Sequence, residues 1–459
     1  VHEHEELALV ELESGVVRAR MRAPAPVRPL SADDLEAGAL RQTLAPIIDV
    51  RALLPLAQLE VAVRSLAMLD GQGKTVVRGS LSQPVVLDLA LRPALPARLA
   101  LAAVRGYDDA LARVRRVLEQ ELGFRPAAQP LVAEAVSAAG GTPGGISSQI
   151  DTTLRYDERA DAAAVAVLKR LLEVIEANLE GTIADVDPEF LHDLRVATRR
   201  SRSVQDELRG VFPAAELARH RAEFRWLAQI TGHARDLDVH VLQFDAYRRM
   251  LADAKHADLD PLLEVLRSRR RVAHDQMVQA LTSERAASLF SEWARFLSAV
   301  EAMPEDARPD GARTIGELTG ERIRKAYERL LRMGGAIDGA SPAEIYHDLR
   351  KRGKKLRYML DLFAARLYPG PVVTEMLRAL KGLQDTLGRH QDCEVQAALL
   401  TTLSDEVAQL PDGPRALMAM GVLVDRLGED ALATRREFAE RFATFASKQQ
   451  RQLIKQTFR

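Results

Sequence analysis

Aromatic residues and cysteine are both scarce in this chain of 459 residues. Phe, Trp and Tyr together make up 5% of the sequence, so its cores must be filled mainly by Leu, Ala and Val. Cys393 is the one cysteine, which excludes an internal disulfide and is compatible with a reducing compartment. The length exceeds one ordinary core, so we expect two or three domains.

Net charge and long apolar runs are also lacking. The chain carries 64 basic and 65 acidic residues, a net charge of −1, so it has no general attraction to nucleic acids or to anionic membranes. No uninterrupted apolar stretch approaches the roughly 20 residues of a membrane-spanning helix, and the N-terminal VHEHEE lacks the apolar segment of a signal peptide. We therefore expect no membrane insertion and a cytoplasmic location.

The pattern of the chain predicts an α+β fold class overall. Residues 1–137 combine two helical patterns with strand-like runs at 15–23, 59–69, 74–81 and 84–91. Residues 138–154, rich in Gly, Pro and Ser, are typical of a linker. Residues 155–302 and 314–459 show helical periodicity throughout and predict two helical bundles, joined by a loop at 303–313.

The helical region contains an internal repeat. HDLRVATRRSR (192–202) and HDLRKRGKKLR (347–357) are nearly the same peptide, 155 residues apart. Two further pairs of segments match at offsets of 155 and 156: 168–179 with 323–334, and 224–239 with 380–395. Three segments in register indicate duplication, and we expect two bundles of similar design around a pseudo-twofold axis.

Each copy of the repeated peptide places a stripe of cations on one helical face. At 100° per residue, the His-x-x-Arg-x-x-x-Arg/Lys-x-x-Arg spacing confines four side chains to an arc of about 80°. One interpretation is that each stripe faces water or pairs with glutamates of neighbouring helices. The duplication favours another, in which the two stripes line a shared basic groove or pore that binds a phosphate polyanion.

These motifs, followed by GHARDLDV and GRHQDCEV, resemble the CHAD family, the conserved histidine α-helical domain, over roughly residues 155–455. The resemblance implies binding of inorganic polyphosphate through the basic faces and location on polyphosphate or polyester (polyhydroxyalkanoate) storage granules, with granule surface proteins as further candidate partners. It also implies that Asp236 and Asp392 orient neighbouring cations, while Gln391 stands where the first copy has Arg235. The candidate polyphosphate-binding residues are Lys169, His192, Arg195, Arg199, Arg200, Arg202, Arg225, Arg235, Arg324, His347, Arg350, Lys351, Lys354, Lys355, Arg357, Lys381 and His390.

The two repeated histidines have two open interpretations. His192 and His347 could donate to phosphate, more strongly when protonated below a pH of about 6.5. Alternatively, each is a neutral histidine, packed near the start of its helix and hydrogen-bonded to backbone. Neither helix offers a second metal ligand at the next turn, so we expect no metal site there.

The first region resembles a degenerate CYTH domain, the triphosphate-tunnel fold. Active members carry an E-x-E-x-K strand that holds a divalent metal, but here Glu3 and Glu5 are followed by Leu7, and the late strand retains only Asp88. Arg18, Arg20 and Arg22 could still line a tunnel wall. We expect no enzymatic activity and no cofactor, a divalent metal being needed only if this domain is active.

Two rival functions follow from the same residues. A metal-dependent triphosphatase or polyphosphate-processing enzyme would need the missing glutamates. A nucleic-acid-binding protein would use the same cations, but the basic helices lack interleaved aromatics for base stacking, so we do not expect a nucleic acid as the partner. Chain-length preference and oligomeric state do not follow from the sequence.

Overall fold

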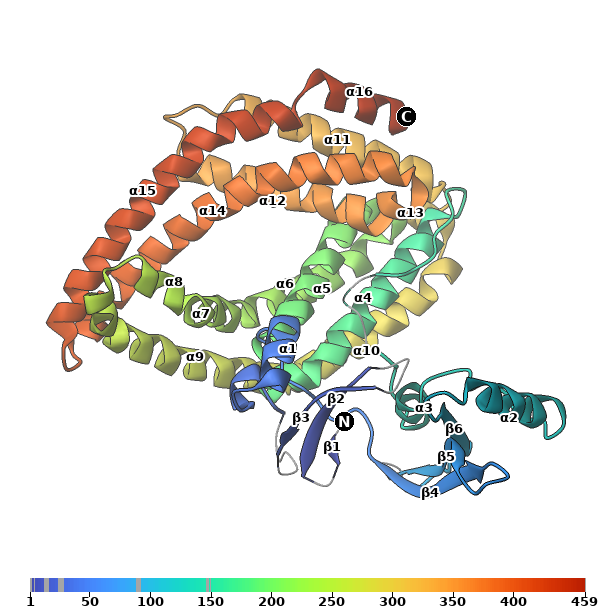
Figure 1. The fold of residues 1–459 in the computed structure, drawn as a ribbon. Helices are drawn as coiled ribbons and strands as arrows, with labels where there is room; N and C mark the ends of the chain where they lie inside the picture. Colours follow the sequence, from blue (N-terminus) through green and yellow to red (C-terminus); the bar gives the residue numbers. More distant parts are fainter. Residues whose placement is uncertain are drawn as a thin grey trace. The chain divides into compact units, whose positions relative to one another are not determined.

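The computed structural model describes residues 2–3, 5–11, 16–23, 29–87, 92–145, 148 and 150–458. It divides into two compact units, Val1–Ser147 and Ser148–Arg459 (Figure 1). The boundary lies inside the segment 138–154 that the sequence marks as a linker. No helix in the described part of the chain combines the length and the apolarity needed to cross a membrane.

The first unit contains two antiparallel three-stranded sheets among its described residues. One sheet has the order β1-β2-β3 and the other β4-β5-β6. The strands are β1 (His2–Glu3), β2 (Glu6–Val10), β3 (Val17–Arg22), β4 (Leu59–Leu69), β5 (Thr75–Val86) and β6 (Arg98–Ala103), and the helices are α1 (Ala39–Ile48), α2 (Asp108–Gln120) and α3 (Leu131–Ala138). A closed tunnel stays a prediction.

The strand predictions for this unit are partly wrong. Residues 74–81 and 84–91 were expected to form two strands, but β5 runs without a break from Thr75 to Val86, and β6 was not predicted. Pro84 is tolerated inside β5 because it faces the side where β6 no longer pairs, and its carbonyl accepts from Leu95 N at 2.9 Å. Asp88 lies outside the described residues.

The second unit is helical (Figure 1). Its helices are α4 (Ala160–Ile183), α5 (Pro188–Glu207), α6 (Ala214–Ile230), α7 (Gly232–Leu242), α8 (Phe244–Arg249), α9 (Asp260–Leu281), α10 (Glu284–Ala299), α11 (Ile315–Gly335), α12 (Ala343–Met359), α13 (Ala365–Leu367), α14 (Gly370–Ala408), α15 (Gly413–Phe445) and α16 (Lys448–Thr457). A single core, rich in Leu, Ala and Val as the composition predicts, extends through this unit. Gly181 of α4 leaves room for the ring of Phe190, where a Cβ would collide, so α4 and α5 pack closely.

The helices of the second unit contact one another in a closed order. α5 contacts α12, α12 contacts α14, α14 contacts α9, α9 contacts α7, and α7 contacts α5. The long α14–α15 hairpin carries the chain from α12 across to α9 (Figure 1). Two symmetric bundles stay a prediction, because α14 is one continuous helix whereas the matching first-half segment is divided at Thr231 into α6 and α7.

The segment between the two halves is anchored and not a free loop. Arg308 is 2% exposed and forms an ion pair with Asp161, which is fully buried at the start of α4. The same guanidinium donates to the carbonyl of Met303 at 2.7 Å. Arg159, which is half-exposed, also pairs with Asp161, at 2.8 Å.

We expect Arg308→Met to lower the free energy of unfolding by about 3 kcal/mol. Removing one partner of a buried pair leaves an uncompensated charge, and the effect lies at the low end of the usual range because Arg159 remains beside Asp161. Arg159→Met is the matched control and should cost less than about 1 kcal/mol. Urea denaturation followed by circular dichroism measures both, and equal losses would show that Arg308 has no special role.

Candidate polyanion-binding site

The start of α5 agrees with the prediction from the sequence, whereas the start of α12 does not. α5 starts as expected, with Pro188 at its first position and Asp187 accepting from Glu189 N at 2.8 Å. For α12 the sequence Ser341-Pro342-Ala343-Glu344 predicts a capping box. This prediction is wrong, because the helix starts at Ala343 without a side-chain cap. Ser341 instead donates to Asp338 at 2.9 Å, which stabilises the preceding turn.

The centre of the site is where α5 meets α12, with Arg199 and Lys354 close enough to influence each other. These residues are equivalent in the repeat, since both lie seven positions after the repeated histidine. The pKa of Lys354 falls from 10.5 to about 8, first because its ammonium is buried and then because of the positive charges of Arg350 and Arg199. Among the residues that the structure describes, neither Lys354 nor the buried Nε of Arg199 has a hydrogen-bond or ion-pair partner. The charge of Asp392 acts on Lys354 in the opposite sense, but burial and the neighbouring cations outweigh it.

Two acidic residues that the sequence interpretation missed hold the flanks of this centre. Asp206 of α5 pairs with Lys355 of α12 at 2.7 Å, which is an attraction between the two helices. Asp361, 155 residues later, pairs with Arg357 at 3.4 Å. Burial raises the pKa of Asp361, and the positive charges of Arg357 and Arg200 oppose this rise. The signal was present in the repeat, because the same offset relates Asp206 to Asp361.

Arg195 and Arg350 are equivalent cations with their own supports. Arg195 Nη1 donates to the carbonyl of Ala228 at 2.9 Å and to Thr231 Oγ1 at 3.0 Å, at the end of α6. Burial lowers the pKa of Arg195 to about 10, which leaves it charged at neutral pH. Arg350 lies 3.8 Å from Asp392, so Asp392 stands beside a cation as the resemblance implied.

The histidine at the start of the first stripe is a neutral acceptor. His192 Nδ1 lies 3.0 Å from Nη2 of Arg235. Because arginine can only donate, Nδ1 must accept, and the ring proton lies on Nε2. Burial, followed by the charge of Arg235, lowers the pKa of His192. Neither earlier interpretation described this contact, which joins two candidate residues; Nε2–H remains a neutral donor.

The second copy makes the corresponding contact with a different group. His347 Nδ1 is hydrogen-bonded to Oε1 of Gln391, so the glutamine takes the place that Arg235 has in the first copy. The second copy therefore has an amide at the position where the first copy has the guanidinium of Arg235. Below, "basic centre" denotes Arg195, Arg199, Arg202, Arg350, Lys354 and Arg357, the cations that these contacts arrange on α5 and α12.

The remaining candidates divide into a near group and a distant group. Burial lowers the pKa of Arg202, and the charge of Arg225 contributes to the same shift. Arg225, an exposed residue of α6, therefore extends the basic centre toward that helix. Arg200 donates to the carbonyl of Ser148 at 2.9 Å. Lys351 and Lys381 are exposed and pair with Asp348 and Asp385 of their own helices, and Lys169 is exposed on α4.

Two candidates are not placed on the basic surface. His390 is 3% exposed and packs edge-on against the ring of Tyr346, with centroids 5.1 Å apart, so it cannot reach a surface ligand. Arg324 Nη1 donates to the carbonyl of Phe458 at 3.2 Å and holds the C-terminal segment against α11. In both cases the repeat placed the residue correctly on its helix but could not reveal what covers it.

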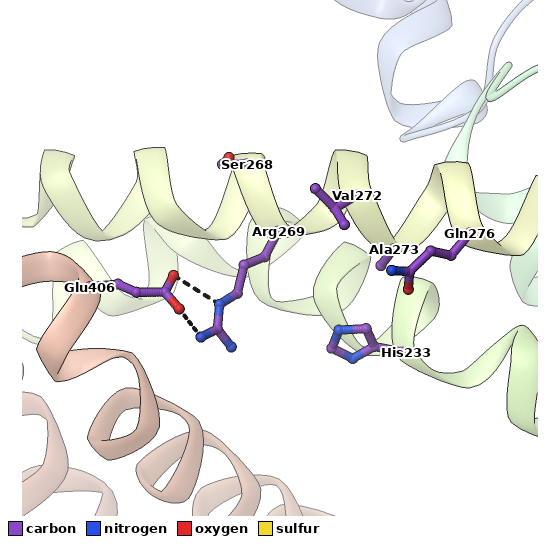
Figure 2. Close-up of a pocket in the computed structure, with 7 residues that line it drawn as sticks. All are labelled: His233, Ser268, Arg269, Val272, Ala273, Gln276 and Glu406. Carbon is purple, nitrogen blue, oxygen red and sulfur yellow. Dashed lines mark hydrogen bonds and ion pairs between the residues drawn. The ribbon is translucent and has the colours of Figure 1, made fainter.

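A separate pocket lies between α7, α9 and α14 (Figure 2). It has a volume of about 270 Å³ and is lined by His233, Ser268, Arg269, Val272, Ala273, Gln276 and Glu406. Arg269 makes a bidentate ion pair with Glu406, one branch at 3.0 Å, at one side of the pocket (Figure 2). Since its cation is already neutralised, this pocket does not offer the unsatisfied charge of the basic centre.

Comparison with known proteins agrees with this geometry. The family model of the CHAD domain matches residues 166–401, which is more than half of the chain and contains both basic helices. The chain belongs to the CHAD domain family. Among solved structures, the CHAD domain from the plant Ricinus communis is similar, with a TM-score of 0.53 and 25% identity, covering 63% of this chain and 95% of that one.

Two curated relatives are also similar to part of this CHAD protein. They are the uncharacterized proteins MT2285 and Rv2226, from two strains of Mycobacterium tuberculosis. Each is 28% identical over 216 residues, which is 45% of this chain. The match spans 38% of the length of those relatives.

We expect Lys354→Met to raise the free energy of unfolding at pH 7 by about 1–3 kcal/mol. The folded-state pKa of about 8 lies below the ordinary 10.5, so the charged form is destabilised by folding, and one pKa unit corresponds to about 1.4 kcal/mol. The wild-type protein should become more stable as pH rises from 8 to 10.5, because the unfolded chain then binds more protons. The variant should lack this rise.

Urea denaturation between pH 7 and pH 10 measures the effect. Lys351→Met, at an exposed position on the same helix, is the control and should change stability by less than about 0.5 kcal/mol. A Lys354→Met variant that is less stable than the wild type at pH 7 would contradict the inference that burial and neighbouring cations destabilise the charged form of Lys354.

Proposed function

We propose that this protein binds inorganic polyphosphate, or a chemically similar phosphate polyanion, at the basic centre. One observation carries the proposal: Arg199 and Lys354 meet at the α5–α12 contact, partly buried, where the neighbouring cations outweigh the carboxylate of Asp392 and neither Lys354 nor Arg199 Nε has a hydrogen-bond partner among the described residues. A phosphate group there would supply further negative charge and the missing acceptor for Arg199 Nε. The CHAD family is associated with polyphosphate-related proteins, which supports the same ligand.

The chemistry of the cations fits a chain of phosphate groups. Arginine donates two parallel hydrogen bonds to phosphate oxygens, and lysine offers an adaptable point charge, so a mixed row tolerates many positions of a flexible polymer. Arg195 and Arg350 are held by Thr231 and Asp392, which fixes part of the row before the ligand arrives. Less conformational entropy is then lost on binding.

A nucleic acid is the rival ligand, and the faces of α5 and α12 count against it. The aromatic residues of these two helices are Phe190, Tyr346 and Tyr358. Phe190 packs on Gly181, Tyr346 is buried, and Tyr358, one turn after Lys354, is half-buried against the core, so none is a fully exposed ring on which a base could stack. Competition between labelled polyphosphate and single- or double-stranded DNA at several salt concentrations distinguishes the two ligands. Stronger displacement by DNA than by unlabelled polyphosphate would favour the nucleic acid.

We further propose that the two halves of the helical unit share one bound chain around a pseudo-twofold axis, and that the protein associates with polyphosphate or polyester granules. The first is supported by the equivalence of Arg199 with Lys354 and of Asp206 with Asp361. The second rests on family membership. A fluorescent fusion that stays diffuse in cells containing granules would contradict it.

We expect Arg199→Ala with Arg202→Ala to weaken polyphosphate binding as much as Lys354→Ala with Arg357→Ala. Each pair should cost about 2–4 kcal/mol at low salt, since a hydrogen bond to a charged group is worth about 1.5–3 kcal/mol and neighbours recover part of the loss. Each pair should also flatten the dependence of log K on log salt, because fewer counterions are released. Fluorescence titration at several salt concentrations measures both quantities.

Arg415→Ala with Arg426→Ala removes two exposed cations from α15 and serves as the control of equal charge. It should leave the affinity nearly unchanged. If one α5 or α12 pair abolished binding while the other changed neither affinity nor salt dependence, the two helices would not share a ligand. If the α15 control matched both pairs, binding would depend on net charge and not on the basic centre.

We propose that the first unit is a non-catalytic companion. Its strands β2 and β3 pair arginine with glutamate: Arg18 with Glu11 at 2.7 Å, Arg20 with Glu6 at 3.1 Å and Arg22 with Glu5 at 3.1 Å. These arginines would then be engaged by carboxylates. Among the described residues, no three His, Cys, Asp or Glu side chains are grouped as metal ligands.

The purified protein should therefore release no phosphate from tripolyphosphate or from a nucleoside triphosphate with Mg²⁺ or Mn²⁺. A malachite green assay detects release, and Glu5→Gln serves as the comparison. Metal-dependent release that co-purifies with the protein and disappears in Glu5→Gln would establish the triphosphatase alternative.

A further inference from the structure

The outer edge of β4 is long, apolar and exposed. β4 and β6 are the two edges of their sheet, and no described strand pairs with the outer side of β4. Every residue of β4 after Leu59 is exposed, including Val63 at 59%, Leu66 at 48% and Leu69 at 56%. Native edge strands are normally shortened, bulged, or protected by proline or lysine, because an open edge pairs with other chains. β4 is eleven residues long, and its charged residues are Glu60 and Arg64.

The hydrogen bonds to β5 determine which backbone groups of β4 point outward. Gln58 O accepts from Leu87 N at 2.9 Å, and Glu60 and Ala62 continue the same alternation opposite Val85 and Gln83. Even-numbered residues therefore direct their N–H and C=O groups toward β5. The odd-numbered residues from Leu59 to Ser65 direct theirs to the open edge.

We propose that β4 pairs antiparallel with β4 of a second copy of this chain, centred on Ala62. In this register Val61 lies opposite the partner's Val63, and each such odd-numbered pair exchanges both backbone hydrogen bonds. Glu60 lies opposite the partner's Arg64, and the twofold symmetry repeats this ion pair. These even-numbered positions are the pairs without mutual hydrogen bonds, where side chains of opposite strands are closest.

Other symmetric registers are less favourable. The outward groups belong to odd-numbered residues, so pairing must match odd with odd. Centring on Arg64 would place Arg64 opposite the partner's Arg64, and centring on Glu60 would place two carboxylates together; like charges directly opposite destabilise a sheet. Centring on an uncharged odd residue such as Val63 would leave Arg64 opposite an alanine. The register on Ala62 satisfies both charges and aligns the β-branched residues.

The resulting dimer should depend on concentration. One pair of strands buries less than the roughly 1,000 Å² that a stable interface needs, so we expect a weak and reversible dimer. An isologous contact uses the edge of each copy completely, so association stops at the dimer. This proposal does not depend on the ligand of the helical unit.

Sedimentation equilibrium of the full chain over a wide concentration range should show a reversible monomer–dimer equilibrium. Glu60→Arg and Arg64→Glu should each weaken the dimer at least tenfold, because each creates like charges at two positions. An equimolar mixture of these variants should dimerise again, since every pair across the strands is then opposite in charge. The double variant Glu60→Arg/Arg64→Glu should recover the wild-type constant, and both side chains are exposed, so folding is not at risk.

A cysteine tests the register directly. In a Cys393→Ser background, Ala62→Cys should form an intermolecular disulfide under mild oxidation, because symmetry brings the two positions opposite each other, whereas Ala67→Cys should not. A protein that stays monomeric at every concentration would overturn the proposal. A dimer whose constant ignores the charge variants, or that crosslinks through Ala67→Cys instead, would also overturn it, and would place the contact elsewhere.

Discussion

Repulsion between like charges at the contact of α5 and α12 is the constraint that shapes the helical unit. Two helices that carry equivalent cations are held together where those cations meet, and burial, followed by the charges of Arg350 and Arg199, lowers the pKa of Lys354 to about 8. The opposing attraction is modest, since the ion pair of Asp206 with Lys355 is partly exposed. The contact must therefore be maintained by the apolar side of each helix, where Leu194 and Leu349 are fully buried.

Because the basic face of each helix repels its partner and the apolar face holds the two together, function and stability oppose each other within one helix. The face that packs has to be complete, because it compensates for the face that repels. Natural sites commonly retain such locally unfavourable arrangements where a ligand relieves them. The basic centre fits that description better than the pocket at Arg269, where Glu406 already satisfies the guanidinium.

Much of the site followed from the sequence because a repeat carries three-dimensional information. The spacing of His192, Arg195, Arg199 and Arg202 fixed which side chains share a helical face, and the structure places that face against its equivalent on α12. Periodicity could not show what covers a face, which is why the burial of His390 beneath Tyr346 was not foreseen. The first unit was harder: the sequence predicts two strands at 74–81 and 84–91, whereas β5 continues through Pro84, and only the end of pairing with β6 shows why this proline is tolerated.

The buried ion pair of Arg308 and Asp161 makes the two halves of the helical unit depend on the segment that joins them. The segment that joins the two halves contacts the start of α4 in the first half through Arg308 and Asp161, and its Asp310 accepts from Arg322 of the second half at 3.0 Å. The connection has become part of the core, so neither half retains a complete interior of its own. A split of the chain before this segment would separate Arg308 from Asp161, and a split after it would separate Asp310 from Arg322, so either cut would leave one half with a broken ion pair.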